Sequence, residues 1–580
     1  MNPRAVLLSV ASGVLFGAAW RGSIPALCGV LGLGLFFVGQ QYLASRNWLR
    51  RLAMAWLTGF TAFAIACTWV FDTAEYLLET ESMFVLVPVA FAVWSIHAFP
   101  FLLFALLFRH CERVANSLAV MPPLWLLCEQ LSPSLFPFPV GSLLVDVPWL
   151  AQPAEIGGVS LLSLIAGCYA LVVPGLYRLW QHWCSWRQER QNRAKAAERR
   201  RDPKGKRKGR GRKSSAEQEA SVGIASTLVG HWRVGLIPCM LGLALIWGAA
   251  QISHLEKAEG EGESLDILIV QADTAHERAN ARMLGAAAKV EGKADLVLWP
   301  ECSIGNFEQS LIGFADDAAV AEAFKSATED DALKLNPVGC PQTPLLLGGD
   351  SWKNAESGGE TQEYVSAYLV DRGGAILGRH DKVSLMPYGE SIPGESLFPF
   401  LRDWFGSQRV ISRGESIRPV GLVQGMSLGA VLCCEDMVPE LSRTLVREGA
   451  DVLISLANGI AFKSEVALQQ HFRISRCRAI ENRRYFVRCA SRGVSAVVAP
   501  SGAIVEELPI LEDCAKVVRV RASSQKTMYS SFGMLPAMVS ALILVALGLR
   551  LPVLAFASER FRFRPATAKR IRTETLVDVH

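Results

Sequence analysis

Three residues with reactive side chains follow or adjoin strand-like segments in the C-terminal half of the 580-residue chain. Glu301 ends the run Leu-Val-Leu-Trp-Pro-Glu, Lys382 lies in Arg-His-Asp-Lys-Val-Ser, and Cys433 ends Gly-Ala-Val-Leu-Cys. A carboxylate, an ammonium and a thiol are groups that nucleophilic and acid–base catalysis uses, and ligands bind at strand ends in α/β domains. Alone, each residue could be a helix cap, a solvated lysine or a small buried hydrophobe. Their order along the chain is therefore more informative than any one of them.

The elements that must position these residues alternate between strands and helices. Residues 251–530 form a segment of 280 residues, which is long enough for one sizeable core. Apolar runs separated by helical stretches are typical of a layered α/β domain. The expected strands are 265–270, 296–299, 345–347, 365–370, 430–432, 452–455 and 494–498, and the expected helices are 274–289, 315–334, 438–449 and 464–483.

In order and spacing, these motifs resemble the nitrilase, or carbon–nitrogen hydrolase, superfamily. Its signature is a Glu after a strand and a Pro, a Lys upstream of Pro-aromatic-Gly-Glu, and a Cys followed at two residues by an acid. The matching stretches here are Trp-Pro-Glu301, Lys382 with Pro387-Tyr-Gly-Glu390, and Cys433-Cys-Glu435, followed by residues 470–481, Arg488 and 500–502. The resemblance implies a four-layer αββα sandwich with Glu301 as general base, Lys382 stabilising the oxyanion and Cys433 as nucleophile.

Hydrophobic stretches of membrane length dominate the first 250 residues of a chain that is 51% hydrophobic and only 19% charged. This composition argues against a soluble multidomain enzyme and excludes a wholly disordered chain. A helix needs about 20 apolar residues to cross the hydrocarbon. We therefore predict a polytopic helical membrane domain of seven spans over 1–250 and an eighth span within 531–556. The predicted spans are 4–20, 24–43, 52–71, 83–108, 116–131, 158–180, 233–250 and 533–556.

The distribution of charge orients these spans. Residues 251–530 hold 29 Lys/Arg and 38 Asp/Glu, which gives this segment a charge of −9. The net charge of the whole chain is +5, so the remaining residues together carry +14. With the N-terminus inside, the inner loops and the basic tail 557–580 hold the Lys/Arg clusters, as the positive-inside rule requires. This topology places the segment 251–530 on the outer face of the membrane and both termini inside.

The basic segment 187–213 holds 14 Lys/Arg and 3 Asp/Glu and has no apolar period. We predict a disordered inner loop close to anionic lipid, rather than a ribosome or nucleic-acid contact. No nucleic-acid partner is expected. The 14 cysteines include no CxxC pair and no Cys/His ligand spacing, so neither a metal nor another cofactor is expected.

One branch of the superfamily, apolipoprotein N-acyltransferase, joins this domain to seven preceding spans and one following span. The chain resembles that branch throughout, except in the basic segment and the tail, and Trp125, Glu129 and residues 148–159 resemble its membrane part. The resemblance implies acyl transfer from a phospholipid, through a Cys thioester, to the N-terminal amine of a diacylated apolipoprotein. Two alternatives are a membrane-tethered nitrilase-like amidase with a small substrate and a transporter or scaffold with an inactive outer domain. Glu129 is the one clear acid inside a predicted span, which argues weakly against transport.

Three further residues are expected to support the chemistry. Glu390 would orient Lys382 or stabilise the acyl-transfer step, and Glu435 would hold the nucleophile turn; a structural salt bridge is the alternative for both. Cys434 stands where the branch commonly has Tyr. It could replace Cys433 as nucleophile, although the Cys-x-Glu spacing favours Cys433, and a disulfide between them would inactivate the enzyme. Residues 364–366 (Tyr-Val-Ser) and 458–462 also depart from the branch.

Overall fold

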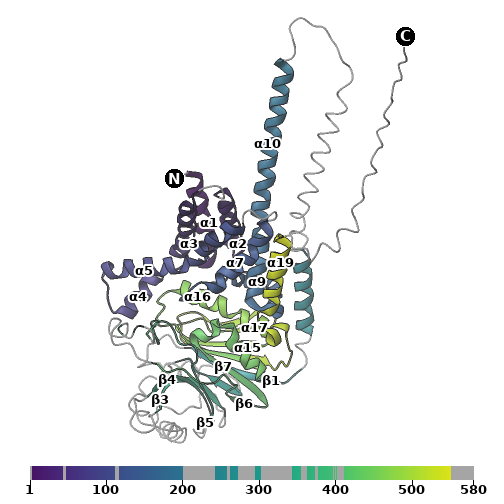
Figure 1. Ribbon diagram of the computed structural model, residues 1–580. Helices are drawn as coiled ribbons and strands as arrows, with labels where there is room; N and C mark the ends of the chain where they lie inside the picture. The colour runs from purple at the N-terminus through teal and green to yellow at the C-terminus, as the bar shows by residue number, and fades with distance from the viewer. Residues whose placement is uncertain are drawn as a thin grey trace, which may run out of the picture.

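A group of helices from the N-terminal part of the chain lies against a sandwich of two β-sheets (Figure 1). Between them lie α15 (Pro439–Arg447), α16 (Glu465–Ser475) and α17 (Cys477–Asn482). The computed structural model describes residues 3–43, 47–111, 117–199, 242–257, 262–271, 294–301, 343–353, 362–371, 376–392, 394–395, 398, 400 and 411–549.

The first sheet has six strands in the order β12-β1-β2-β3-β4-β5. Strands β1, β2 and β3 run parallel to one another, and the remaining neighbours pair antiparallel. The bounds are β1 Ser264–Gln271, β2 Leu296–Leu298, β3 Leu345–Lys353, β4 Gln362–Val370, β5 Ile376–Asp381 and β12 Cys514–Arg521. Glu301 and Lys382 thus follow β2 and β5.

The second sheet has the order β11-β10-β9-β8-β7-β6, with β7, β8 and β9 parallel at its centre. Its central strands are buried on both faces, which explains their nearly continuous apolar sequences. The bounds are β6 Gly421–Val423, β7 Met426–Leu432, β8 Val452–Asn458, β9 Tyr485–Ser491, β10 Ala496–Val498 and β11 Ile504–Glu507. Cys433 follows β7 directly.

The core of the sandwich lies between the two sheets. Ile267 and Leu298 of the first sheet belong to one buried cluster with Leu428 and Ile454 of the second. Because side chains alternate along a strand, Leu453 points to the other face, where it joins the cluster that contains α16 and α17. The α/β sandwich expected from the sequence is confirmed. The helices predicted over 274–289 and 315–334 lie outside the described residues.

The N-terminal helices pack around a cluster of aromatic side chains that includes Phe36, Phe101, Phe104 and Trp125. Their bounds are α1 Pro3–Arg21, α2 Leu27–Tyr42, α3 Trp48–Ala66, α4 Val70–Leu78, α5 Met83–His97, α6 Phe99–Cys111, α7 Ser117–Leu131, η1 Val140–Asp146, α8 Pro148–Ala151, α9 Ala154–Ala170 and α10 Val172–Arg199. Residues 242–257 are also helical, and α18 (Met528–Phe532) and α19 (Leu535–Leu549) follow the sandwich.

By length and composition, three helices in the described part of the chain could cross a membrane: Pro3–Arg21, Met83–His110 and Ala154–Asn192. Shorter apolar helices cover Leu27–Tyr42, Leu118–Leu131 and Leu535–Ala546. The predicted spans 233–250 and 533–556 extend beyond the described residues, as does the tail 557–580. The total of eight membrane spans and the orientation of these spans remain predictions.

Three predicted elements are corrected. The run 52–71 is not one helix: α3 ends at Ala66, and α4 begins at Val70 with a bend of 73°. The expected helix 464–483 is divided into α16 and α17, with a break at Arg476. Residues 187–199 are helical rather than disordered, because their Gln, Glu, Arg, Lys and Ala residues are good helix formers and extend an established helix. Residues 200–213 lie outside the described residues.

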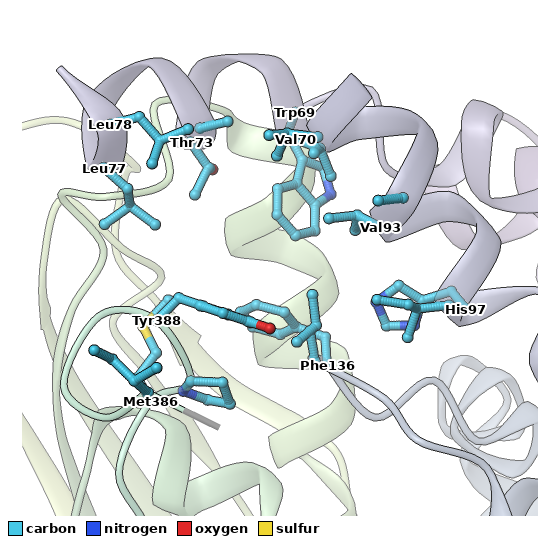
Figure 2. A pocket seen from close by; sticks show the side chains of 17 residues that line it. Trp69, Val70, Thr73, Leu77, Leu78, Val93, His97, Phe136, Met386 and Tyr388 are labelled. Atoms are coloured by element: carbon cyan, nitrogen blue, oxygen red, sulfur yellow. The ribbon is translucent and has the colours of Figure 1, made fainter. Parts of the chain in front are cut away.

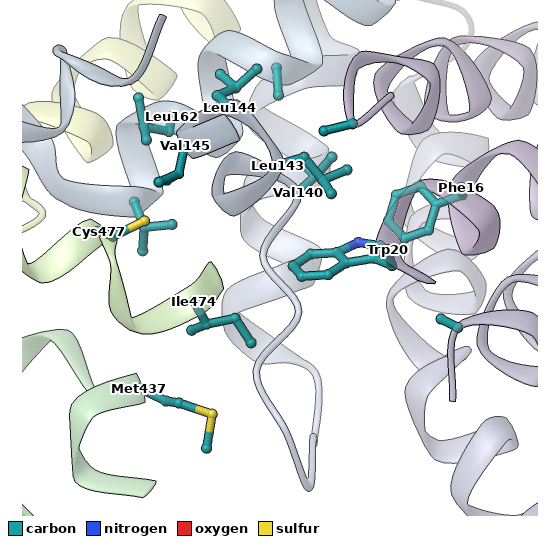
Figure 3. Packing of buried hydrophobic residues seen from close by; sticks show 14 of the residues in the cluster. Phe16, Trp20, Val140, Leu143, Leu144, Val145, Leu162, Met437, Ile474 and Cys477 are labelled. Atoms are coloured by element: carbon teal, nitrogen blue, oxygen red, sulfur yellow. The ribbon is translucent and has the colours of Figure 1, made fainter. Parts of the chain in front are cut away.

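The bend between α3 and α4 is held from the sandwich side by Gln470 of α16. Its amide nitrogen donates to the carbonyl oxygens of Trp20 (3.1 Å) and Ala66 (2.8 Å), and its oxygen accepts from the Trp69 indole (2.9 Å). These carbonyls belong to the ends of α1 and α3, where helical partners run out. Around this contact, Phe16, Trp20 and Leu143 of the helices share one apolar cluster with Met437 and Ile474 (Figure 3). The two parts are therefore packed into one body.

Candidate active site

Glu301 lies two residues beyond Trp299, the first residue after β2, with 3% of its surface exposed. The neighbouring strand β3 passes very close to it at Gly348. A Cβ atom on Gly348 would lie 2.5 Å from the Glu301 Cα, a separation that real Cβ atoms do not adopt. The glycine therefore makes room for the position of the glutamate.

Lys382 follows β5 and is held by its backbone on both sides. Its N–H donates to the Val365 carbonyl (2.8 Å), and its carbonyl accepts from the Gly414 N–H (2.9 Å). Val365, one of the departures from the superfamily branch, is buried in β4 between the sheets. Val365 therefore positions Lys382 through its main-chain carbonyl.

Cys433 begins a 3₁₀ turn, η4 (Cys433–Met437), at the end of β7. Its φ of 46° lies in the left-handed region, which costs a non-glycine residue energy and is over-represented at functional sites. The thiol donates to the Asn458 carbonyl (3.6 Å) and lies within the electrostatic influence of the Glu301 carboxylate. The strand-to-turn connection thus directs the sulfur toward the end of β2 in the other sheet.

The ammonium of Lys382 bridges two carboxylates. Nζ lies 2.9 Å from Glu301 Oε1 and 2.6 Å from Glu390 Oε1. Lys382 and Glu301 are both buried, while the Glu390 side chain is 18% exposed. The backbone N–H of Met386 donates to the other Glu390 oxygen (2.8 Å), so Glu390 has a fixed orientation. The structure brings all three residues of the sequence motif together and adds Glu390 to them.

Burial sets the electrostatics of this cluster. Burial raises the pKa of Glu301 to about 7, against the opposing effect of the Lys382 charge. For Lys382, burial acts to lower the pKa, but Glu301, Cys434 and Glu390 together raise it well above its ordinary value. Burial and the Glu301 charge raise the pKa of the Cys433 thiol, which Lys382 opposes. At neutral pH the cluster therefore holds a permanent cation, a thiol and a carboxyl group poised to accept a proton.

Cys434 points to a different neighbour. Its thiol donates to the Ser384 carbonyl (3.3 Å) in the loop after Lys382, and both adjacent cysteines are free thiols. Both are buried, and burial is the largest cause that raises the pKa of each. After burial, the Glu301 charge is the largest influence on the pKa of the Cys433 thiol, whereas for the Cys434 thiol it ranks behind Lys382 and Glu390. The geometry thus gives Cys433 the neighbouring carboxylate that a nucleophile needs.

Glu435 ties the nucleophile turn to the lysine loop. One carboxylate oxygen accepts from the backbone N–H groups of Val383 (2.6 Å) and Ser384 (3.0 Å), and the other from Leu432 N–H (2.9 Å). His380 Nε2 completes the set at 3.0 Å. Burial alone would raise the pKa of Glu435, but His380 and the backbone donors lower it overall. His380 therefore serves Glu435 and not the thiol.

Sequence reasoning missed a second buried group behind the turn. Asp436 accepts from His471 (2.7 Å), Ser455 (2.8 Å) and Arg488 (3.1 Å). Burial opposes its charge, yet His471 and Arg488 lower its pKa to about 2. His471 and Arg488 stood inside the stretches that resemble the superfamily, but no spacing rule paired them with Asp436. The group anchors η4 to α16, β8 and β9.

A largely apolar cavity of about 280 Å³ lies beside the cluster. Trp69, which precedes α4, forms one wall with Val70 of α4 and Val93 of α5, and Met386 and Tyr388 form the opposite wall (Figure 2). The Met386 N–H is the group that holds Glu390, so the cavity and the Lys382 support share one loop. Trp69 and Phe136 also contact Phe462, in the stretch that begins with Asn458.

Two family models match consecutive parts of the chain. Residues 12–172 match the apolipoprotein N-acyltransferase N-terminal domain, and residues 251–521 match carbon–nitrogen hydrolase. An apolipoprotein N-acyltransferase of Pseudomonas aeruginosa is 24% identical over 528 residues, covering 87% of each chain. The chain belongs to the apolipoprotein N-acyltransferase family. It is thus an acyltransferase built on the carbon–nitrogen hydrolase fold.

Other relatives match parts of the chain. An apolipoprotein N-acyltransferase of Geobacter metallireducens is 29% identical over 251 residues, which is 43% of this chain and 44% of that protein. Among solved structures, an amidase from Nesterenkonia sp. is 18% identical with a TM-score of 0.32, covering 46% of this chain and 93% of that one. The matches to apolipoprotein N-acyltransferases thus extend over both halves of the chain. The match to the amidase covers less than half of it.

Proposed function

We propose that this acyltransferase moves an acyl chain from a phospholipid to Cys433 and then to the N-terminal amine of an S-diacylglyceryl-cysteine lipoprotein. The observation that carries the proposal is a buried cluster in which Lys382 Nζ lies 2.9 Å from Glu301 Oε1 and the Glu301 charge acts on the neighbouring Cys433 thiol. A base, a cation and a nucleophile in one cluster are what two successive acyl transfers require.

In the first half-reaction, Glu301 takes the proton of the Cys433 thiol, and the thiolate attacks the ester carbonyl of the phospholipid. The tetrahedral oxyanion accepts hydrogen bonds from the Lys382 ammonium and from the backbone N–H of Cys434. Losing one such donor costs on the order of 10²–10³ in rate. When the intermediate collapses, the ester C–O bond breaks, and protonated Glu301 returns its proton to the departing lysophospholipid oxygen. The product is a thioester on Cys433.

In the second half-reaction, the free amine of the lipoprotein attacks the thioester carbonyl. Glu301 accepts the proton that the amine loses, the C–S bond breaks, and the thiolate regains a proton from Glu301. The net change is one ester consumed and one amide formed. Glu390 keeps Lys382 in place for both steps, and Glu435 keeps the nucleophile turn against the lysine loop. Cys434 has a structural role.

The cavity beside the cluster suits a lipid acyl chain. Its lining is almost entirely apolar, and its walls come from both the helices and the sandwich. A donor lying in a bilayer could enter it laterally, with its chain against Trp69 and Phe136. An acyl chain in this apolar cavity would also help to keep water from the thioester, which would otherwise hydrolyse.

The sandwich would face the outer side of a bacterial inner membrane, with both termini in the cytoplasm. In support, the start of α1 and the Arg-rich end of α10 both lie on the side of the helices away from the sheets (Figure 1). Basic segments on one side agree with the positive-inside rule. The lipid donor and the lipoprotein acceptor would then meet the cluster on the opposite side.

The experiment is a reconstituted reaction with a phospholipid labelled in its acyl chain and a synthetic diacylglyceryl-cysteine peptide. We expect the label on the peptide amine, with one lysophospholipid released for each peptide that is acylated. A peptide whose amine is already acetylated serves as the control and should receive none. Label released only as free fatty acid would support a hydrolase and contradict the proposal.

A further inference from the structure

A second cavity, of about 370 Å³, lies between the helices and the sandwich on the other side of Phe136 and His97. Its walls come from the loop after α7, from α9, and from the start of α15, with Arg478 of α17 and Tyr529 of α18. Its volume is within the range of small-molecule sites. The reaction derived above does not use it.

Two charged side chains that line the cavity, Arg478 and Glu129, each have a buried atom without a hydrogen-bond partner among the described residues. Arg478 is fully buried and pairs with Glu481 through Nε (3.0 Å) and Nη2 (3.1 Å), but its Nη1 has no hydrogen-bond partner in the part of the chain that the structure describes. Glu129 uses one oxygen for the Trp125 indole and the Val140 N–H, both at 2.8 Å, while Oε2 has no partner among the described residues. A buried charged group left unsatisfied is costly, so both atoms call for a ligand.

The position of the cavity indicates what this ligand is. Met534, at the start of α19, lies in its wall, and Glu129 belongs to the last turn of α7. Beyond Met534, α19 presents an exposed apolar face formed by Leu535, Met538, Leu542 and Ile543. Helix ends mark the level of lipid headgroups, and such an apolar face is suited to acyl chains. The cavity therefore meets a bilayer at headgroup depth.

We propose that this cavity binds the headgroup of a zwitterionic phospholipid that is not consumed by the reaction. Its phosphodiester accepts from Arg478 Nη1, its ammonium meets the free oxygen of Glu129, and its acyl chains lie along α19. A simple anion is disfavoured because Glu129 and Glu440 both line the cavity. The lipid would brace α7 and α19 against Met437, the last residue of the turn that begins at Cys433.

The test uses the full-length Cys433→Ala protein, which cannot turn lipid over, in nanodiscs that contain phosphatidylethanolamine with a photoreactive headgroup. Cross-linked peptides are mapped by mass spectrometry. We expect cross-links in residues 132–139 and 437–440, and competition by unlabelled phosphatidylethanolamine but not by phosphatidylglycerol.

Ser134 supplies a matched pair of variants, because it lines the cavity from an exposed loop. Ser134→Trp should fill the cavity and abolish these cross-links, whereas Ser134→Ala and the distant, exposed Ser524→Trp should retain them. Equal cross-linking in Ser134→Trp and Ser134→Ala, or cross-links confined to residues 386–392, would overturn the site. Equal competition by phosphatidylglycerol would overturn the zwitterionic assignment. Because Cys433 is absent throughout, none of these results depends on the proposed reaction.

Discussion

Glu435 accepts a hydrogen bond of 2.6 Å from the backbone N–H of Val383, so the residue two places after Cys433 holds the residue directly after Lys382. With Ser384 N–H on the same oxygen and Leu432 N–H and His380 on the other, one buried carboxylate joins both catalytic loops. The relative position of thiol and ammonium therefore depends on Glu435.

We expect Glu435→Gln to lower acyl-enzyme formation strongly while leaving the protein folded. The amide would turn an NH₂ group toward backbone donors and lose charge-assisted bonds that contribute about 1.5–3 kcal/mol each. Single-turnover rates and apparent Tm in detergent measure the two effects. The exposed Glu448→Gln is the control and should match wild type; a Glu435→Gln rate equal to it would contradict this role.

The rate of acyl-enzyme formation should rise with pH through about 7. Burial raises the pKa of Glu301 from 4.5 to about 7, so the carboxylate becomes available as a base only as pH passes that value. The Lys382 pKa is raised well above 10.5, so its charge persists across the range. Below pH 7 the single-turnover rate should fall by about tenfold per pH unit. A midpoint near 4.5 would show that Glu301 is not the desolvated base.

Gly348→Ala should impair catalysis by displacing Glu301. The added Cβ would meet the Glu301 Cα at 2.5 Å, and neither backbone can yield without moving the other. Overpacking of this kind costs about 1–3 kcal/mol, and the displaced carboxylate would leave the thiol. The adjacent Gly349→Ala is a matched control, because nothing lies within 4 Å of its Cβ position. Equal activity of the two variants would refute the requirement for space at Gly348.

Gln470→Leu should loosen the sandwich from the helices. It leaves the Trp69 indole and the Ala66 carbonyl without their Gln470 partner, at about 1–3 kcal/mol for each unsatisfied buried group, while the Trp20 carbonyl keeps its hydrogen bond from Arg473 (3.1 Å). We expect a lower apparent Tm and faster proteolysis between the two parts. The exposed neighbour Gln469→Leu should change stability by no more than about 0.5 kcal/mol. A Tm unchanged by Gln470→Leu would contradict a stabilising role for Gln470 between the two parts.

Much of the site could be predicted because its residues stand in short linear motifs at strand ends. Glu301 and Cys433 each follow a strand that an apolar run predicts, and the α/β architecture follows from such runs. Strand β5, which precedes Lys382, is not among the predicted strands, because its sequence Ile-Leu-Gly-Arg-His-Asp ends in polar and charged residues. The bend at Ala66 could not be predicted, because it depends on Gln470, which lies about 400 residues away along the chain. The Asp436 group and the contact of Gly348 with Glu301 likewise join distant segments.

Local propensity explains the remaining differences. Strands β9 and β12 were missed because Tyr485–Ser491 follows a helix without a turn signal and Cys514–Arg521 carries charges on an alternating pattern at the sheet edge. The charge of residues 187–199 predicts disorder, but the high helix propensity of the same residues continues α10 to Arg199.

The central claim is that the acyl chain passes through a thioester on Cys433. It is tested by incubating wild type, Cys433→Ser and Cys434→Ser with labelled phospholipid and locating the adduct by peptide mass spectrometry, with hydroxylamine treatment to identify a thioester. We predict a hydroxylamine-labile acyl group on Cys433 in wild type and Cys434→Ser, which disappears when a diacylglyceryl-cysteine peptide is added and reappears as its amide. A thioester that forms in Cys433→Ser, or one that transfers only to water, would contradict the account.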